Sequence, residues 1–233
     1  MLLAAIVLAF GPVGRSYADW RRYVWTYEYQ TMREGTAEIE YYLTEEQKKA
    51  DDSEQSAWKH QLELEYGITD HLDISMYQMF RQSNTDSANT FEYDGFKLRT
   101  RYQILEKNEL PVDALLYLEY IRNDNLEKPN ILEGKLVLAK DIAKFNIAYN
   151  QIIIQELESG GETEHEFAAG IRYGIKSLSI AMESKGNYTA GKYYAGPTLS
   201  WDTERFWVAI GALGGLSGKS DDLQTRMIMG ILF

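Results

Sequence analysis

Apolar and polar residues alternate with a period of two along most of the chain. Between residues 62 and 66, for example, Leu62, Leu64 and Tyr66 alternate with Glu63 and Glu65. Successive side chains of a β-strand point to opposite faces, so this pattern predicts strands with one apolar and one polar face. Few segments show the helical period, and the chain has only 4 prolines.

Twelve segments with this alternation follow one another from Thr36 to the C-terminus, separated by turn residues. They are 36–44, 58–68, 72–81, 91–104, 112–121, 131–140, 143–154, 164–174, 178–185, 192–202, 205–213 and 223–233. Repeated alternating segments with turn signals between them are typical of all-β folds. A count of fourteen strands stays open if one long segment contains two strands.

The last segment, Leu223–Phe233, has one nearly all-apolar face and ends on an aromatic residue. It resembles the closing strand of bacterial outer-membrane β-barrels. In that family the terminal aromatic residue is part of the signal that the barrel-insertion machinery reads, so the resemblance implies this role for Phe233. It also implies a location in the bacterial outer membrane. The alternative is an ordinary edge strand at the end of a soluble sheet.

The spacing of loops and aromatic residues favours the membrane barrel. Short turns are expected at 69–70, 105–110, 141–143, 175–177 and 203–204, and longer polar loops at 45–57, 82–90, 122–130, 155–163, 186–191 and 214–222. Outer-membrane barrels have short turns at one end and long loops at the other. Aromatic residues adjoin the short turns, as a membrane interface requires: Tyr66, Tyr102, Phe145, Tyr173, Trp201, Phe206 and Phe233. The sequence therefore predicts a transmembrane, antiparallel, up-and-down β-barrel of twelve strands over residues 36–233, surrounded by outer-membrane lipids.

The first eighteen residues are expected to be a signal peptide. Met1–Phe10 is apolar but too short to span a bilayer, and small residues precede a cleavage position after Ala18. No Lys or Arg precedes the apolar run, which departs from the usual pattern.

Residues 19–35 precede the first barrel strand. Tyr23, Trp25, Tyr27 and Tyr29 alternate here and predict an aromatic strand. A thirteenth barrel strand would have the wrong direction, because twelve strands already return the chain to the end where Phe233 lies. We therefore expect a periplasmic or lumen-entering segment.

Charge and cysteine content exclude some partners. The net charge of −11 argues against a nucleic-acid partner, which requires a basic face. The absence of cysteine excludes disulfides and thiolate metal sites. No later stretch is long and apolar enough for a transmembrane helix.

The polar faces of the strands would line the interior of such a barrel. Ten charged residues are the predicted lumen lining: Glu38, Glu40, Glu63, Glu65, Lys97, Arg99, Arg101, Glu119, Arg172 and Arg226. Two interpretations remain open: a water-filled conduit whose field orients charged solutes, or an ion-paired filling of a narrow barrel. Twelve strands lie between packed eight-strand barrels and open sixteen-strand porins. If 223–233 pairs with 36–44, Arg226 is expected to reach Glu38 or Glu40, directly or through water.

Signals for catalysis are weak. His60, His71 and His165 lie on different segments without ligand spacing, and there is no nucleophile elbow. Gly218-Lys219-Ser220 lacks the earlier glycine of a phosphate loop. No catalytic residue, metal site or cofactor is predicted.

Two strand-turn phrases, 66–72 and 196–201, are similar to those of uncharacterised outer-membrane transporters of the porin-like type. The first functional hypothesis is therefore a channel or transporter for a small solute. The alternatives are an outer-membrane enzyme that acts on lipids and a structural barrel with a plugged lumen.

Overall fold

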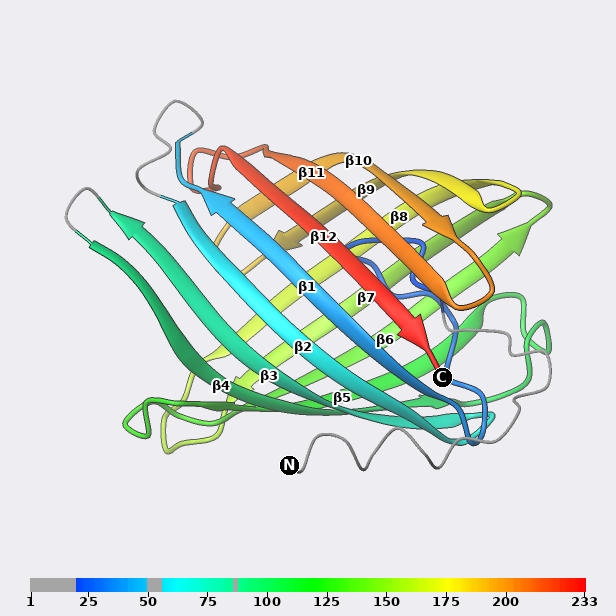
Figure 1. The fold of residues 1–233 in the computed structure, drawn as a ribbon, viewed down its shortest axis with the longest axis horizontal. Coiled ribbons are helices and arrows are strands. Elements are labelled where there is room, and N and C mark those ends of the chain that lie inside the picture. The colour runs from blue at the N-terminus through cyan, green and yellow to red at the C-terminus, as the bar shows by residue number, and fades with distance from the viewer. Residues whose placement is uncertain (1–19, 50–55, 86–87) are drawn as a thin grey trace.

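Twelve strands close into a single β-barrel in the computed structural model of this chain (Figure 1). The structure describes residues 20–49, 56–85 and 88–233, so the expected signal peptide, 1–18, lies outside the described residues. The strands are β1 (Ala37–Gln47), β2 (Ser56–Thr69), β3 (Leu72–Thr85), β4 (Ala88–Gln103), β5 (Asp113–Asn123), β6 (Ile131–Ile142), β7 (Phe145–Glu156), β8 (Thr163–Ile175), β9 (Leu178–Asn187), β10 (Lys192–Asp202), β11 (Phe206–Gly215) and β12 (Leu223–Leu232).

Each strand pairs antiparallel with its neighbours in the sequence, and β12 pairs with β1 to close the sheet. This confirms the predicted twelve-stranded up-and-down barrel and its closing pair. In the closing register Glu38 lies opposite Leu232 and Tyr42 opposite Ile228. Closure gives each of the twelve described strands a partner strand on both edges, which is what a sheet in a bilayer requires.

The strands are longer at the long-loop end than the alternation predicts. The predicted loop 82–90 is wrong for most of its length, because Ser83 pairs with Thr90 and Gln82 with Phe91 as β3 and β4 continue. Likewise β1 continues to Gln47, inside the predicted loop 45–57. Polar side chains on both faces give no alternation signal, yet the backbone hydrogen bonds of the ladder continue through them.

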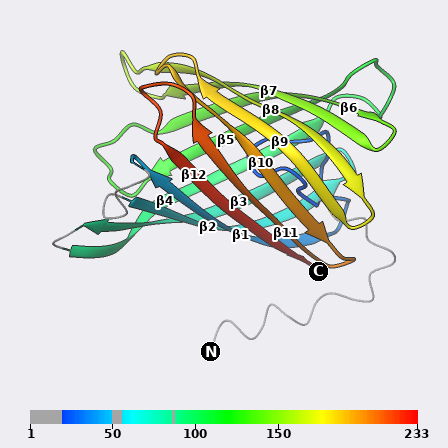
Figure 2. The same cartoon turned by 90° about the horizontal axis from the view of Figure 1, so that it is seen from above.

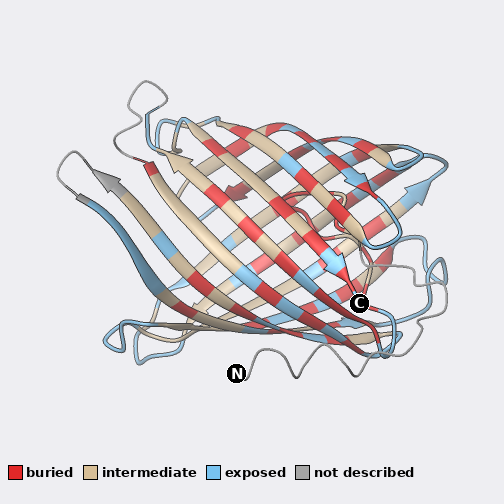
Figure 3. Ribbon diagram, viewed as in Figure 1, coloured by how far each residue is buried: buried red, intermediate tan, exposed pale blue. Residues whose placement is uncertain are grey.

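The outer face of the barrel carries an apolar band between two sets of aromatic rings. Side chains such as Leu64 and Met182 expose about half of their surface, 51% and 53% respectively. Exposed and buried residues alternate along the strands in Figure 3. None of the described residues forms a helix long and apolar enough to cross a membrane.

Aromatic rings flank this band at both ends. At the short-turn end, Phe145 packs on Tyr173 with ring centroids 4.9 Å apart, and Trp201 packs on Phe206. At the long-loop end the rings form two groups: Phe80, Phe91 and Tyr93, and Tyr149, Phe167, Tyr188 and Tyr193. Amphipathic rings at two heights are the arrangement that both interfaces of a bilayer favour. The second set was not predicted.

Residues 20–35, here called the N-terminal segment, run inside the barrel. Figures 1 and 2 show this segment, in dark blue, enclosed by the strands. Tyr23, Val24 and Met32 are fully buried. The predicted aromatic strand is wrong, because the segment forms no strand and its backbone bonds to side chains of the barrel wall instead.

Small residues of the wall make room for the segment. A Cβ atom added at Gly170 would lie 2.5 Å from the Tyr23 ring, and one at Gly211 would lie 2.6 Å from the Trp25 ring. Buried alanines line the same region: Ala139, Ala148, Ala168, Ala181 and Ala209. The wall and the N-terminal segment are therefore complementary in shape.

Candidate functional site

Glu183 of β9 binds three successive backbone N–H groups of the N-terminal segment. Its Oε1 accepts from Val24 N at 2.7 Å, and its Oε2 accepts from Trp25 N and Thr26 N, both at 2.8 Å. The hydroxyl of Thr26 donates to the same oxygen at 2.9 Å. Successive N–H groups that converge on one carboxylate form an anion-binding nest. Glu183 therefore anchors the segment in the middle of the barrel.

Other wall residues hold the segment further along. Asn150 of β7 binds both backbone groups of Tyr27, accepting from its N at 2.6 Å and donating to its O at 2.9 Å. Arg172 of β8 forms an ion pair of 2.6 Å with Glu28, and Asp73 of β3 accepts from Met32 N at 3.0 Å. These bonds replace the partner strand that the segment lacks.

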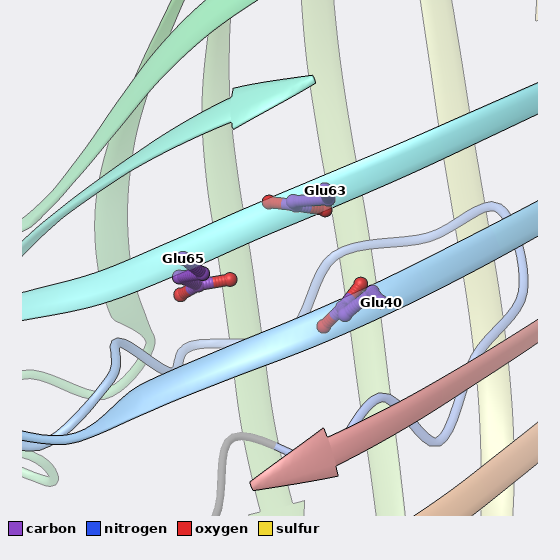
Figure 4. Close-up of side chains that lie close together, drawn as sticks. All are labelled: Glu40, Glu63 and Glu65. Atoms are coloured by element: carbon purple, nitrogen blue, oxygen red, sulfur yellow. The ribbon is translucent and has the colours of Figure 1, made fainter. Parts of the chain in front are cut away.

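A buried charge network lies on the wall formed by β1 to β4. Glu40 of β1 and Glu63 and Glu65 of β2 bring carboxylate oxygens within 4.8 Å of one another (Figure 4). Arg99 of β4 lies 2.9 Å from Glu63 and 2.6 Å from Glu65. Arg101 of β4 binds Glu65 as well, so two guanidinium groups face the three carboxylates.

The remaining carboxylates of this wall also have partners. Asp73 lies 2.7 Å from Arg101, and Glu38 accepts a hydrogen bond from the indole of Trp207. The Tyr42 hydroxyl lies between Glu40 and Glu63. Buried carboxylates that are close together require such partners, because their mutual repulsion and desolvation are otherwise costly. The carboxylates of β2 thus meet the guanidinium groups of β4 inside the barrel, across β3.

A cavity of about 500 Å³, here called the loop-side cavity, lies between the N-terminal segment and the long loops. Three ion pairs line this cavity: Lys97 with Glu119 at 2.9 Å, Lys135 with Glu133 at 2.6 Å, and Lys59 with Glu46 at 2.8 Å. Five tyrosines line it as well: Tyr27, Tyr42, Tyr77, Tyr117 and Tyr194.

A second cavity of about 40 Å³ lies towards the short turns. Tyr27 lines the larger cavity, whereas Glu28, Tyr29 and Arg172 line the smaller one. The N-terminal segment therefore separates the two spaces.

The structure places all ten predicted lumen residues on the inner side of the wall. Eight of them are buried: Glu38, Glu40, Glu63, Glu65, Arg99, Arg101, Glu119 and Arg172. The other two, Lys97 and Arg226, line the loop-side cavity. Seven of the ten lie on β1, β2 and β4, whereas Arg172 lies apart on β8.

Arg226 does not make the direct contact expected with Glu38 or Glu40 among the described residues. Its Nε donates to Thr44 Oγ1 at 2.8 Å. The register explains the difference, since Thr44 lies opposite Arg226 whereas Glu40 lies opposite Gly230, four residues further along β12. A bridge through water stays a prediction.

Sequence reasoning gave Asn150 and Arg21 no role, assigned Trp25 only to the predicted aromatic strand, and did not distinguish Glu183 from the other inward polar residues. One signal could have suggested a filled lumen: several inward positions of the later strands are occupied by alanine or glycine, as at Ala148 and Gly170. Small inward residues leave space that another part of the chain must fill, because protein interiors are closely packed.

No protein-family model matches the sequence, and no curated protein matches it. Solved structures do resemble the fold. The KdgM porin, solved in complex with disordered oligogalacturonate, matches with a TM-score of 0.58 and 12% identity over 85% of this chain and 98% of that chain. An outer-membrane channel from Pseudomonas putida F1 matches with a TM-score of 0.58 and 12% identity over 88% of this chain and 98% of that chain.

This chain has the fold of an outer-membrane channel. A third solved structure, the NanC porin, agrees, with a TM-score of 0.58 and 11% identity over 84% of this chain and 98% of that chain. At these identities the likeness concerns the barrel itself, and the interior must be interpreted from its own residues.

The histidines show no catalytic arrangement in the described part of the chain. His60 Nδ1 lies 2.7 Å from the Tyr41 hydroxyl, and His71 Nε2 lies 3.0 Å from Glu106.

Proposed function

We propose that the protein is an outer-membrane channel for small charged solutes. The observation that carries the proposal is the combination of an apolar outer band with a charged cavity of about 500 Å³ inside a closed barrel. The fold likeness to the KdgM porin, whose structure was solved with oligogalacturonate, supports the same class of function.

The N-terminal segment and the network around Arg99 favour a second candidate, a structural barrel with a filled lumen. Glu183, Asn150 and Arg172 all bind the segment, which separates the two cavities. The channel hypothesis therefore requires that the segment shift when solute passes. The two candidates differ in what happens when the segment is removed.

We expect planar bilayers with the mature chain to show small and infrequent current steps. A variant that lacks residues 20–32 should show larger ohmic steps, because the charged wall then faces an aqueous lumen. Shortening the loop between β5 and β6 by four residues is a suitable control, since this loop lies outside the barrel. Silence of the deletion variant, in a barrel that still resists detergent unfolding at room temperature, would support the structural candidate instead.

The terminal residue is proposed to act in assembly through the barrel-insertion machinery. Phe233 N donates to Ala37 O at 2.9 Å, and the side chain of Phe233 remains 44% exposed at the short-turn end. We expect deletion of Phe233 to lower the amount of folded barrel in the outer-membrane fraction several-fold. The Phe233→Tyr variant, which keeps an aromatic ring, should retain it. The fraction of heat-modifiable protein on gels measures both, and equal amounts in the deletion variant and the wild type would contradict this role.

A further inference from the structure

The carboxylates of the loop-side cavity all have hydrogen-bond or ion-pair partners. Lysines bind three of them, as described above for Glu46, Glu119 and Glu133. Asn187 Nδ2 donates to both Glu164 and Glu166, at 2.5 Å and 2.8 Å. Asp221 accepts from the hydroxyl of Tyr194 at 3.0 Å. The carboxylates of the cavity therefore have their hydrogen-bond and ion-pair partners within the protein.

Four cations in the lining of the same cavity form no ion pair with a carboxylate among the described residues: Arg21, Lys185, Lys192 and Arg226. Arg21 donates to the Tyr42 hydroxyl at 3.1 Å and lies 4.1 Å from the centre of the Tyr27 ring. Lys185 lies 5.3 Å from the ring of Tyr194 and 5.9 Å from that of Trp25. Arg226, which donates a hydrogen bond to Thr44, also lies 5.6 Å from the centre of the Trp25 ring.

Arg226 is repelled by two of the other cations. The charge of Arg226 acts against that of Lys185, and the charge of Arg21 acts against that of Arg226. Carboxylates attract these cations only from beyond ion-pair distance: Glu46 and Glu166 attract Lys185, Glu46 attracts Arg226, and Glu40 attracts Arg21. Like charges that are withdrawn from bulk water without paired counter-charges are costly, so this arrangement favours a bound anion.

Trp25 adds a neutral donor to the same region. Its side chain lines the cavity and is largely buried, and its indole N–H has no hydrogen-bond partner in the described part of the chain. Buried N–H groups are normally paired. The aromatic ring also offers an apolar face beside the cations, which an organic molecule can cover and a bare inorganic ion cannot.

We propose that the loop-side cavity binds a small organic oxyanion, a carboxylate or phosphate, between Arg21, Lys185 and Arg226, with its apolar part against Trp25. A volume of about 500 Å³ is within the usual range for a small-molecule site. The proposal deepens the proposed function and rests on it, since the ligand would be the solute class that the channel admits. Arg21 and Trp25 belong to the N-terminal segment, so the complete site exists only while the segment is in place.

Isothermal titration of the mature protein in an uncharged detergent tests this site. The probes are citrate, glucose 6-phosphate, glucose and spermidine, measured at low and high salt. We expect both anions to bind with an affinity that falls as salt rises, and glucose and spermidine not to bind. Binding of citrate alone would assign the site to carboxylates, and binding of glucose 6-phosphate alone would assign it to phosphates.

Two charge-removing variants locate the binding. Lys185→Met and Arg226→Met should each weaken anion binding by about tenfold or more, because each removes a charged partner from a site sheltered from water. Lys140→Gln is a matched control, because Lys140 lies at the short-turn end, where it contacts Asn108. Deletion of residues 20–32 should abolish binding, since it removes Arg21 and Trp25.

Unchanged affinity in both Met variants, or equal binding of glucose and glucose 6-phosphate, would overturn the anion site. Titration does not depend on conduction, so the two proposals fail separately. A barrel that binds anions and never conducts would contradict only the channel. A barrel that conducts without binding either anion would contradict only this inference.

Discussion

Replacing Arg99 by methionine is expected to lower the free energy of unfolding by roughly 3–5 kcal/mol. Arg99 is buried and lies within 3 Å of both Glu63 and Glu65. Its removal leaves these carboxylates beside each other and beside Glu40, with Arg101 and, through the Tyr42 hydroxyl, Arg21 as the remaining cations near them. Methionine has a similar length and keeps the packing, so the loss reports on charge. Unfolding by urea in lipid vesicles, followed by tryptophan fluorescence, measures it.

A matched pair on the neighbouring strands gives the control for this prediction. Arg81 of β3 and Asp94 of β4 lie 3.5 Å apart, and both remain partly exposed. An exposed ion pair contributes at most about 1 kcal/mol, so Arg81→Met should change stability little. Adding Glu63→Gln and Glu65→Gln to Arg99→Met should restore much of the loss, because no buried charge is then left without a partner. If Arg99→Met is as mild as Arg81→Met, water reaches the network and the lumen is open at this height.

The barrel was predictable from the sequence because alternation records which face of a strand is apolar. The closing pair followed from parity: β12 ends at Leu232, and the next residue, Phe233, bonds to Ala37, the first residue of β1. Strand ends were less well predicted, because the strands are polar on both faces there, as around Ser83 and Thr90. Periodicity assigns a side chain to the lumen, but it does not say how far along the lumen the side chain lies.

For that reason, the contacts across the lumen could not be predicted from the sequence. Arg226 and Glu40 were both assigned to the interior, yet four residues of register separate them along β12. The contact between Arg99 and Glu65 crosses an intervening strand, so no pairing rule between neighbouring strands leads to it. Glu183 looked like any other inward carboxylate, because its partners are backbone N–H groups, which every residue except proline carries.

The N-terminal segment decides how the interior can work. It supplies Arg21 and Trp25 to the loop-side cavity and Glu28 to the smaller cavity, so both spaces have one wall that is not part of the barrel. The barrel wall is held by continuous backbone pairing, whereas the segment is held by a few side chains. When the lumen partly opens, the segment is therefore expected to detach from the wall before any of the strands separate.

Replacing Glu183 by alanine is expected to release the centre of this segment. The change removes the acceptor of three backbone N–H groups and of the Thr26 hydroxyl. Hydrogen bonds to a charged acceptor contribute about 1.5–3 kcal/mol each, and even a total of about 3 kcal/mol raises the released population roughly a hundredfold. Glu183→Gln should have a smaller effect, since its amide keeps one acceptor oxygen.

Cysteine labelling measures this release directly, because the chain contains no cysteine of its own. Val24 is fully buried, so the thiol of a Val24→Cys variant should react slowly with a membrane-impermeant maleimide. We expect Glu183→Ala to accelerate this reaction by one to two orders of magnitude, on the order of the population change above. Glu164→Ala is the control, since the hydrogen bond of Glu164 is with Asn187 and not with the segment.

The same pair of variants connects the anchor to conduction. If the segment obstructs the channel, Glu183→Ala should also raise the frequency of current steps in planar bilayers, whereas Glu164→Ala should leave it unchanged. Gly170→Leu provides an independent route to the same state, because its side chain would occupy the position of the Tyr23 ring. Slow labelling at residue 24 in both Glu183→Ala and Gly170→Leu barrels that remain folded would show that the segment does not depend on this anchor. Fast labelling without any current would instead show that a released segment still leaves the lumen closed.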